Sequence, residues 1–118
     1  MREILFRGKR IDNDEWVYGD LVRIGNKSYI THCVDPDTVG QYTGLTDKNG
    51  KKIFEGDIVV VPLSGKSAKG IVEYFKTDIC GFVVITQPEY SNYVLQKNST
   101  YEVIGNIHDN PELLEEQS

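Results

Sequence analysis

Two histidines and two cysteines are the residues of this sequence that could bind a metal ion or form a nucleophilic site. A Cys2His2 zinc site would have to use His32, Cys33, Cys80 and His108, since thiolate and imidazole are preferred zinc ligands. Such ligands are usually paired at a short spacing such as C-x2-C, which is absent here. A Cys–His nucleophile would also need an orienting group, and nothing in the spacing supplies one. We therefore predict no metal, no cofactor and no catalytic residue.

Three carboxylates, Glu55, Asp57 and Glu73, are candidates for general acid–base chemistry. Paired carboxylates perform such chemistry when their surroundings separate their pKa values. An Asp that follows Gly in a turn more often accepts hydrogen bonds from backbone amides, which favours a structural role for Asp57. The predicted structural turn residues are Asn49, Gly50, Gly56 and Asp57.

The tripeptide Gly65-Lys66-Ser67 matches the end of a phosphate-binding P-loop. The first glycine of that motif would belong at position 60, which is Val60, and the stretch opens no helix. We predict a flexible loop over residues 64–70 instead.

Aromatic and basic residues along the chain predict an interaction surface. If several share an exposed face, they could stack unpaired bases or grip a peptide. The alternative is that Trp16, Phe54 and Phe75 belong to the core and the tyrosines surround it with their hydroxyls in water. The candidate surface residues are Arg7, Lys9, Trp16, Tyr18, Tyr42, Lys51, Lys52 and Tyr74.

Composition and charge limit the classes of partner. The 118 residues are 39% hydrophobic and carry a net charge of −5, as expected for one globular domain. Four of the eighteen acidic residues lie beyond position 108, which leaves a nearly neutral body. A non-specific DNA-binding protein normally has a dominant basic field, so this balance disfavours nucleic acid. The first residues have too short an apolar run for a signal peptide, no run is long enough to span a bilayer, and we expect a cytoplasmic protein without membrane contact.

Short runs of β-branched and aromatic residues between turn signals predict an all-β fold. We expect strands over residues 3–11, 15–24 and 28–34, with Gly19 marking a bulge or a close backbone approach. Residues 39–61 contain the densest turn chemistry: a strand at 41–43, a hairpin turn at Asn49-Gly50, and a buried strand that begins at Asp57. Further strands are expected at 71–75, 81–86 and 101–107.

The end of the chain changes its pattern. Asn110 is a good N-cap and Pro111 suits the first helical position, so we predict a short helix. The predicted organisation is an N-terminal β-meander over residues 1–38, an SH3-like, partly open barrel over 39–108, and an acidic helix or tail over 109–118. One continuous domain is the alternative.

Five blocks of this sequence resemble the YopX family of small proteins from bacteriophages and prophages of Gram-positive bacteria. They are ILFRGK at 4–9, EWVYG at 15–19, GQYTGLTD at 40–47, GKKIFEGDIV at 50–59 and VIGNI at 103–107. The blocks extend to NPELL at 110–114, so the resemblance covers almost the whole chain. It implies a mostly β fold with an SH3-like barrel in the C-terminal part. The family carries no established activity, so there are no catalytic residues to transfer.

We therefore expect a non-enzymatic phage or prophage accessory protein that acts through protein–protein contacts and self-association in its bacterial host. Its partner would be a phage or host protein, or a second copy of itself. Two alternatives stay open: a nucleic-acid-binding module that uses aromatic stacking and local Arg/Lys clusters, and a regulator of a host enzyme or a small hydrolase.

Overall fold

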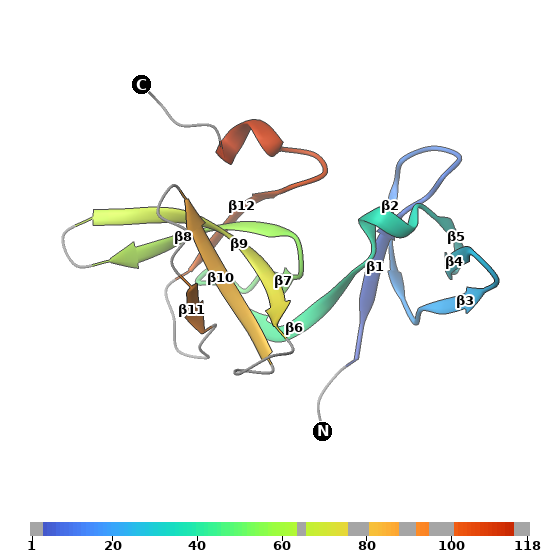
Figure 1. Ribbon diagram of the computed structural model, residues 1–118, viewed down its shortest axis with the longest axis horizontal. Helices are drawn as coiled ribbons and strands as arrows, with labels where there is room; N and C mark the ends of the chain where they lie inside the picture. The colour runs from blue at the N-terminus through green and yellow to red at the C-terminus, as the bar shows by residue number, and fades with distance from the viewer. Residues whose placement is uncertain (1–3, 64–65, 76–80, 88–91, 95–100, 115–118) are drawn as a thin grey trace.

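The structure describes residues 4–63, 66–75, 81–87, 92–94 and 101–114. In this computed structural model they form antiparallel strands and two 3-10 turns, η1 (Pro36–Thr38) and η2 (Pro111–Leu114), which confirms the predicted all-β class (Figure 1). The strands are β1 (Phe6–Lys9), β2 (Trp16–Gly19), β3 (Val22–Ile24), β4 (Lys27–Ile30), β5 (His32–Val34), β6 (Gly40–Thr46), β7 (Lys52–Phe54), β8 (Asp57–Leu63), β9 (Lys66–Phe75), β10 (Gly81–Gln87), β11 (Asn92–Val94) and β12 (Glu102–Asn106).

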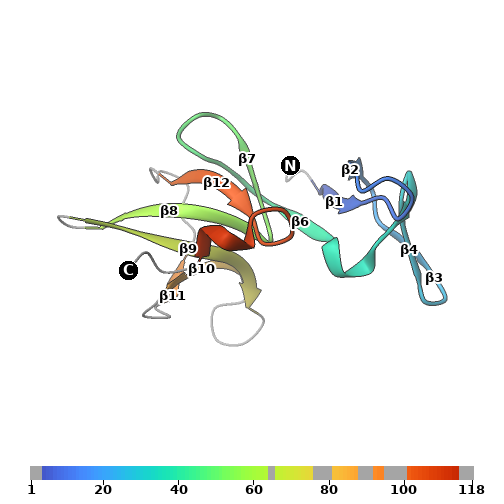
Figure 2. The same ribbon diagram turned by 90° about the horizontal axis from the view of Figure 1, so that it is seen from above.

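The strands are arranged in three sheets. A three-stranded sheet has the order β3-β4-β5, a four-stranded sheet the order β2-β1-β6-β7, and a five-stranded sheet the order β11-β10-β9-β8-β12. The three-stranded sheet lies at one end of the molecule and the five-stranded sheet at the other, with the β1–β2 hairpin between them (Figures 1 and 2). The hairpin therefore lies at the contact between the two ends.

One face of the β1–β2 hairpin turns towards the C-terminal half. Side chains alternate along a strand, and cross-strand partners share a face. Arg7 pairs with Tyr18 and Lys9 with Trp16, so these four side chains lie together. All four were predicted interaction residues.

The opposite face of the hairpin packs on the three-stranded sheet. Ser28, Ile30 and Val34 are buried there. A Cβ atom on Gly8 would lie 3.1 Å from Val34 Cγ2 and 3.3 Å from Ile30 Cδ1. Glycine at this position lets the two layers pack closely.

The core of the C-terminal half forms between the five-stranded sheet and the β6–β7 hairpin. Ile53 of β7 and Val59 of β8 are fully buried in it, as are Val72 of β9 and Val84 of β10. Full burial of an aliphatic side chain contributes about 1.5–3 kcal/mol relative to exposure. The β-branched run at the start of β8 thus supplies the buried strand that the sequence predicts.

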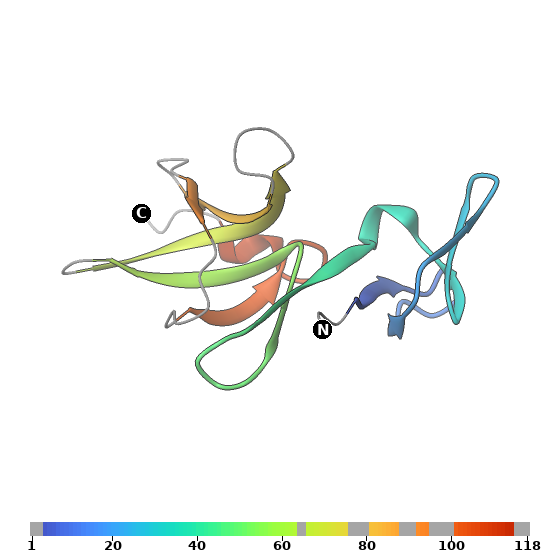
Figure 3. The same ribbon diagram turned by 90° about the horizontal axis from the view of Figure 1, so that it is seen from below.

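Strand β6 belongs to both halves of the molecule. Its first residues, Gly40 and Gln41, pair with β1, and its later residues Tyr42 and Thr46 pair with β7. Figures 1 and 3 show β6 running from the N-terminal half into the C-terminal half. The predicted domain boundary near residue 38 stays a prediction. Strand β6 hydrogen-bonds both to β1, which precedes this boundary, and to β7, which follows it.

The turn between β6 and β7 is held by Asp47. Its Oδ1 accepts hydrogen bonds from the backbone N–H groups of Asn49 (2.8 Å) and Lys51 (2.9 Å), and its Oδ2 from that of Val103 in β12 (3.0 Å). Desolvation raises the pKa of Asp47, but these three donors outweigh it and the pKa lies below its ordinary value. The turn is therefore fixed to the five-stranded sheet.

Two predicted strands are each divided in the structure. The strand expected over residues 15–24 is β2 and β3, which belong to different sheets because the chain leaves the first sheet after Gly19. The strand expected over 28–34 is β4 and β5, which pair with each other across Thr31 at φ 61°. The first third is thus a hairpin followed by a separate three-stranded meander.

Two further expectations need correction, and a third is not confirmed. The loop predicted over 64–70 is wrong from Lys66 onwards, because Lys66 to Gly70 pair with β8 in a hairpin. The predicted C-terminal helix is a single 3-10 turn, too short to be an α-helix. The described strands form open sheets and no closed barrel, so the SH3-like barrel is not confirmed.

Candidate functional site

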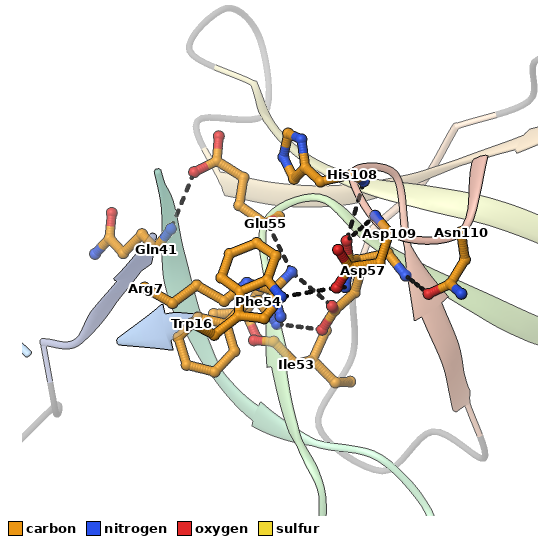
Figure 4. A network of polar contacts seen from close by, with 12 residues as sticks. Arg7, Trp16, Gln41, Ile53, Phe54, Glu55, Asp57, His108, Asp109 and Asn110 are labelled. Carbon is orange, nitrogen blue, oxygen red and sulfur yellow. Dashed lines mark hydrogen bonds and ion pairs between the residues drawn. The ribbon is translucent and has the colours of Figure 1, made fainter. Parts of the chain in front are cut away.

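A buried ion pair joins the two halves of the molecule. Arg7 Nη2 of β1 donates a hydrogen bond of 2.7 Å to Asp57 Oδ1 of β8, and both side chains are almost fully buried (Figure 4). Asp57 Oδ2 accepts a second hydrogen bond from the backbone N–H of Phe54 (2.8 Å). Burial raises the pKa of Asp57, while Arg7 and the Phe54 N–H oppose that shift. A buried carboxylate of this kind depends on its cation.

Aromatic rings surround the Arg7 guanidinium. Its central carbon lies 4.7 Å from the ring centroid of Trp16 and 4.9 Å from that of Phe54. Arg7 Nε is buried and has no hydrogen-bond partner among the described residues. Attraction between a cation and a ring face is strongest away from water, so the rings offset part of the cost of burying this charge.

A second polar contact lies beside the first. Asp109, after β12, forms an ion pair with Lys9 Nζ through Oδ1 and accepts a hydrogen bond of 2.7 Å from Trp16 Nε1 at Oδ2. Partial burial raises the pKa of Asp109, but the hydrogen bonds from Lys9, Trp16 and Asn106 outweigh this and lower it to about 2. Asp109 is therefore held as a carboxylate at neutral pH.

His108 completes this group of residues. Its ring centroid lies 6.0 Å from that of Trp16. Burial lowers the pKa of His108, and the positive charges of Arg7 and Lys9 lower it further, while Asp109 and Asp35 act in the opposite direction. The neutral imidazole is the form that suits this position.

We call the side chains of Arg7, Lys9, Trp16, Phe54, Asp57, His108 and Asp109 the junction cluster. Its two carboxylates are each bound to a cation from β1, so its geometry holds two halves together rather than presenting an unpaired acid and base. Among the described residues, which do not include Cys80, no group of three or more His, Cys, Asp or Glu side chains could hold a metal ion. No helix in the described part of the chain is long and apolar enough to cross a membrane.

Several of the predicted surface residues lie at this junction. Tyr18 is 52% exposed and its ring centroid is 5.5 Å from that of Phe54. Tyr42 is only 6% exposed, and its ring centroid lies 5.6 Å from that of Phe54. Lys52 Nζ lies 4.9 Å from the ring centroid of Tyr42. The burial of Arg7 and Tyr42 corrects the expectation that they lie on an exposed surface.

The other two predicted surface residues lie elsewhere. Lys51 is exposed just before β7. Tyr74 is half-exposed on β9, where its ring meets that of Phe82 edge-on at 5.1 Å between centroids. Neither belongs to the junction cluster.

The predicted turn residues lie at two separate turns. Gly50 adopts φ 83° after β6 and Gly56 adopts φ 92° before β8, a region that favours glycine. Asn49 does not need a positive φ, and its backbone N–H bonds Asp47 instead. Asp57 binds both the Phe54 amide and Arg7.

Sequence reasoning missed two members of the cluster in this role. Asp109 was grouped with the acidic tail, and His108 was weighed only as a metal ligand or as part of a Cys–His nucleophile. The signal that could have found them is the local spacing: Asn106, His108 and Asp109 form a turn in which Asn106 Oδ1 accepts from the other two backbone N–H groups. The partners of that turn on β1 and β2 are too distant in sequence to be inferred.

A second surface of interest is the outer face of the three-stranded sheet. Ser28, Ile30 and Val34 point inwards, so alternation directs Val22, Ile24, Lys27, Tyr29 and Cys33 outwards. Val22 is 51% exposed and Ile24 65%. Ile11, also exposed, donates its backbone N–H to the Cys33 carbonyl (3.1 Å) beside this face. We call Val22, Ile24, Tyr29 and Cys33 the apolar outer face.

Comparisons with known proteins agree with the sequence blocks described above. The family profile described as YopX protein matches residues 2–115. The chain is similar to the crystal structure of protein EF1440 from Enterococcus faecalis, with 26% identity and a TM-score of 0.61, over 98% of this chain and 100% of that chain. No curated protein sequence matches the chain.

Proposed function

This chain belongs to the YopX protein family, and we propose that it is a non-enzymatic accessory protein of a phage or prophage that acts through protein–protein contacts in the host cytoplasm. A second copy of the chain is the first partner proposed. The apolar outer face carries this proposal.

Exposed apolar side chains on one sheet face support a protein partner. Single exposed hydrophobic residues are normal, but contiguous ones often mark an interaction site. Val22, Tyr29 and Cys33 are register neighbours across the three strands, and Ile24 continues the row along β3. Contact with another protein would remove this face from water, which is favourable in proportion to the apolar area.

The charge pattern supports a second copy as the occupant. Among the described residues of β3, β4 and β5, Lys27 is the one charged side chain that the strand pairing directs to this face. Two identical faces related by a two-fold axis would therefore meet with little like-charge repulsion. We further infer that the C-terminal half is an SH3-like, partly open barrel, which the packing of Ile53 of β7 against β8 and β9 supports.

Nucleic-acid binding has less support. Arg7 is neutralised by Asp57 and Lys9 by Asp109, so these two cations of the predicted surface are not available to phosphates. The exposed Lys51 and Lys52 keep this function as the second candidate. Salt-dependent binding to a single-stranded DNA pool that is lost in a Lys51→Ala, Lys52→Ala variant would favour it over our proposal.

Photo-crosslinking in the host cell tests the proposed function. A p-benzoylphenylalanine replaces Tyr29 on the apolar outer face or, as a matched control, the half-exposed Tyr74 on β9. We expect protein adducts from position 29, including one of twice the mass of the chain, and few from position 74. Equal yields at both positions, or none at position 29, would contradict the proposal.

Light scattering of the purified protein tests the self-association. We expect a mass above that of the monomer, and a monomer when Val22→Asp and Ile24→Asp are combined. A wild-type protein that stays monomeric at high concentration would contradict a second copy as the partner.

A further inference from the structure

We propose that the free edge of β3 is a strand-addition site for an extended segment of another protein, in which an acidic residue lies between two apolar ones. The inference rests on the proposed protein–protein function but concerns the edge of the sheet rather than its outer face. It follows from position, backbone register and charge.

Position leaves one side of β3 open. Among the described strands, β3 is an edge strand in the order β3-β4-β5, and all three of its residues are exposed. Figures 1 and 2 show it at the end of the molecule furthest from the five-stranded sheet. An unpaired strand edge presents N–H and C=O groups on which another strand can form.

The turn that follows β3 determines which backbone groups face this edge. Gly25 and Asn26 form a two-residue hairpin loop, with Gly25 at φ 61° and Ile24 paired with Lys27. Residues that flank such a loop form a hydrogen-bonded pair, and the next pair, Arg23 with Ser28, does not. The N–H and C=O of Arg23 therefore point away from β4, towards the open side.

Side-chain chemistry selects the kind of segment. In a strand that hydrogen-bonds to Arg23, the residue directly opposite lies beside the Arg23 side chain, and opposite charges stabilise such a pair. Arg23 is exposed and forms no ion pair among the described residues. The two neighbouring residues of the segment would lie beside Val22 and Ile24 on the other face, where apolar side chains extend the apolar outer face.

The same charge disfavours a second copy at this edge. An antiparallel pair of two β3 strands centred on their two-fold axis would place Arg23 opposite Arg23, and like charges directly opposite are destabilising. Face-to-face stacking of two copies leaves the edge open, so the two contacts are compatible. The edge therefore fits a partner different from the one proposed for the outer face.

Two labelled peptides test the site. The first is Lys-Thr-Thr-Val-Glu-Val-Thr-Thr-Lys, and the second has Lys in place of the central Glu. We expect the first to bind the wild-type protein about tenfold more tightly than the Arg23→Glu variant, and the second to show the opposite preference. Fluorescence anisotropy gives the affinities, and amide chemical shifts should change at residues 22–24.

Two further variants separate the edge from a general charge effect. Arg23→Pro removes the outward N–H, a substitution that edge strands accept, and should abolish binding. Lys51→Glu makes the same change in net charge as Arg23→Glu at a distant exposed position and should bind as the wild type does. Equal affinities for wild type and Arg23→Glu, shifts outside β3, or no binding at about 1 mM peptide would overturn the inference.

Failure of this inference can be distinguished from failure of the proposed function. Adducts at position 29 without peptide binding would remove the strand-addition site alone. Peptide binding by a protein that gives no adducts at position 29 would remove the proposed role of the outer face alone.

Discussion

Arg7 Nη2 lies 2.7 Å from Asp57 Oδ1, across 50 residues of sequence, and both side chains are buried. Each charge depends on the other, because neither has enough water around it to be solvated. The pair connects β1 to β8 at the place where the chain passes between its two halves. It should therefore be the contact on which the arrangement of the halves depends most.

Removing one member of this pair should be costly. Asp57→Ala leaves the Arg7 charge buried and should lower the free energy of unfolding by about 3–5 kcal/mol. Arg7→Met combined with Asp57→Leu should recover most of that loss, except for the hydrogen bond to the Phe54 amide, worth about 1 kcal/mol. Urea denaturation of the wild type, the single variant and the double variant measures these differences in unfolding free energy. As a control, Lys48→Ala breaks the exposed Lys48–Glu102 pair and should cost under about 1 kcal/mol.

The carboxylate of Asp109 should stabilise the fold above about pH 4 and lose its effect in acid. Its folded pKa of about 2 lies below the ordinary unfolded value of about 3.9, so the contribution is lost as the pH falls between them. After allowance for its partial exposure, Asp109→Asn should cost about 1 kcal/mol at pH 6 and almost nothing at pH 2.

The fluorescence of Trp16, the single tryptophan, reports on the same contact. Its emission should move to longer wavelength in Asp109→Asn but not in Asp20→Asn, which removes an exposed charge. If Asp109→Asn lost the same free energy of unfolding at pH 6 as at pH 2, the charge of Asp109 would not be the cause of the loss.

His108 should give the stability a second pH dependence, which arises from burial and nearby cations rather than from an ion pair. Burial and the neighbouring cations lower its folded pKa below the unfolded value of about 6.5. Stability is therefore complete above that value and falls as the pH drops towards the folded pKa, because the unfolded chain takes up the proton first. Melting temperatures between pH 7 and 5 should fall less in His108→Gln than in wild type. A fall in melting temperature as large in His108→Gln as in the wild type would contradict this origin of the pH dependence.

Gly40→Ala should disturb both halves at once. A Cβ at this position would lie 2.5 Å from the backbone carbonyl oxygen of Glu55, so β6 would have to move. We expect a loss of about 1–3 kcal/mol in unfolding free energy. Gly50→Ala is the comparison: its Cβ would meet no atom of the described residues within 4 Å, but it needs φ 83°, which should cost about 1 kcal/mol. A larger loss in Gly50→Ala than in Gly40→Ala would contradict this steric argument.

Local patterns in the sequence account for much of the fold. The β-branched run after Asp57 and the Gly50 and Gly56 turns are short-range signals, and the structure has β8 and the two turns at these positions. Residues 66–70 are small and polar and resemble a loop in composition. They form a strand because the preceding β8 offers them a hairpin partner in register.

Period-two alternation could show which side chains share a face but not what covers that face. Trp16, Tyr18, Val22 and Ile24 continue one alternating pattern, yet the break after Gly19 sends the last two to another sheet. Arg7 carries no local sign that its charge is buried, because Asp57 comes from a distant strand. The junction cluster therefore required three-dimensional information, whereas the all-β class did not.

The hydrogen bond between Trp16 and Asp109 spans 93 residues of sequence. During synthesis, β1 and β2 can pair as soon as they leave the ribosome, but the face that carries Arg7 and Trp16 is not covered until β7, β8 and then the turn after β12 emerge. Closing so long a loop costs chain entropy that only the finished contacts can offset. Attachment of the N-terminal hairpin should therefore be a late step in folding, and a nascent chain stalled before Asp109 would expose an aromatic, positively charged surface to the chaperones of the cell.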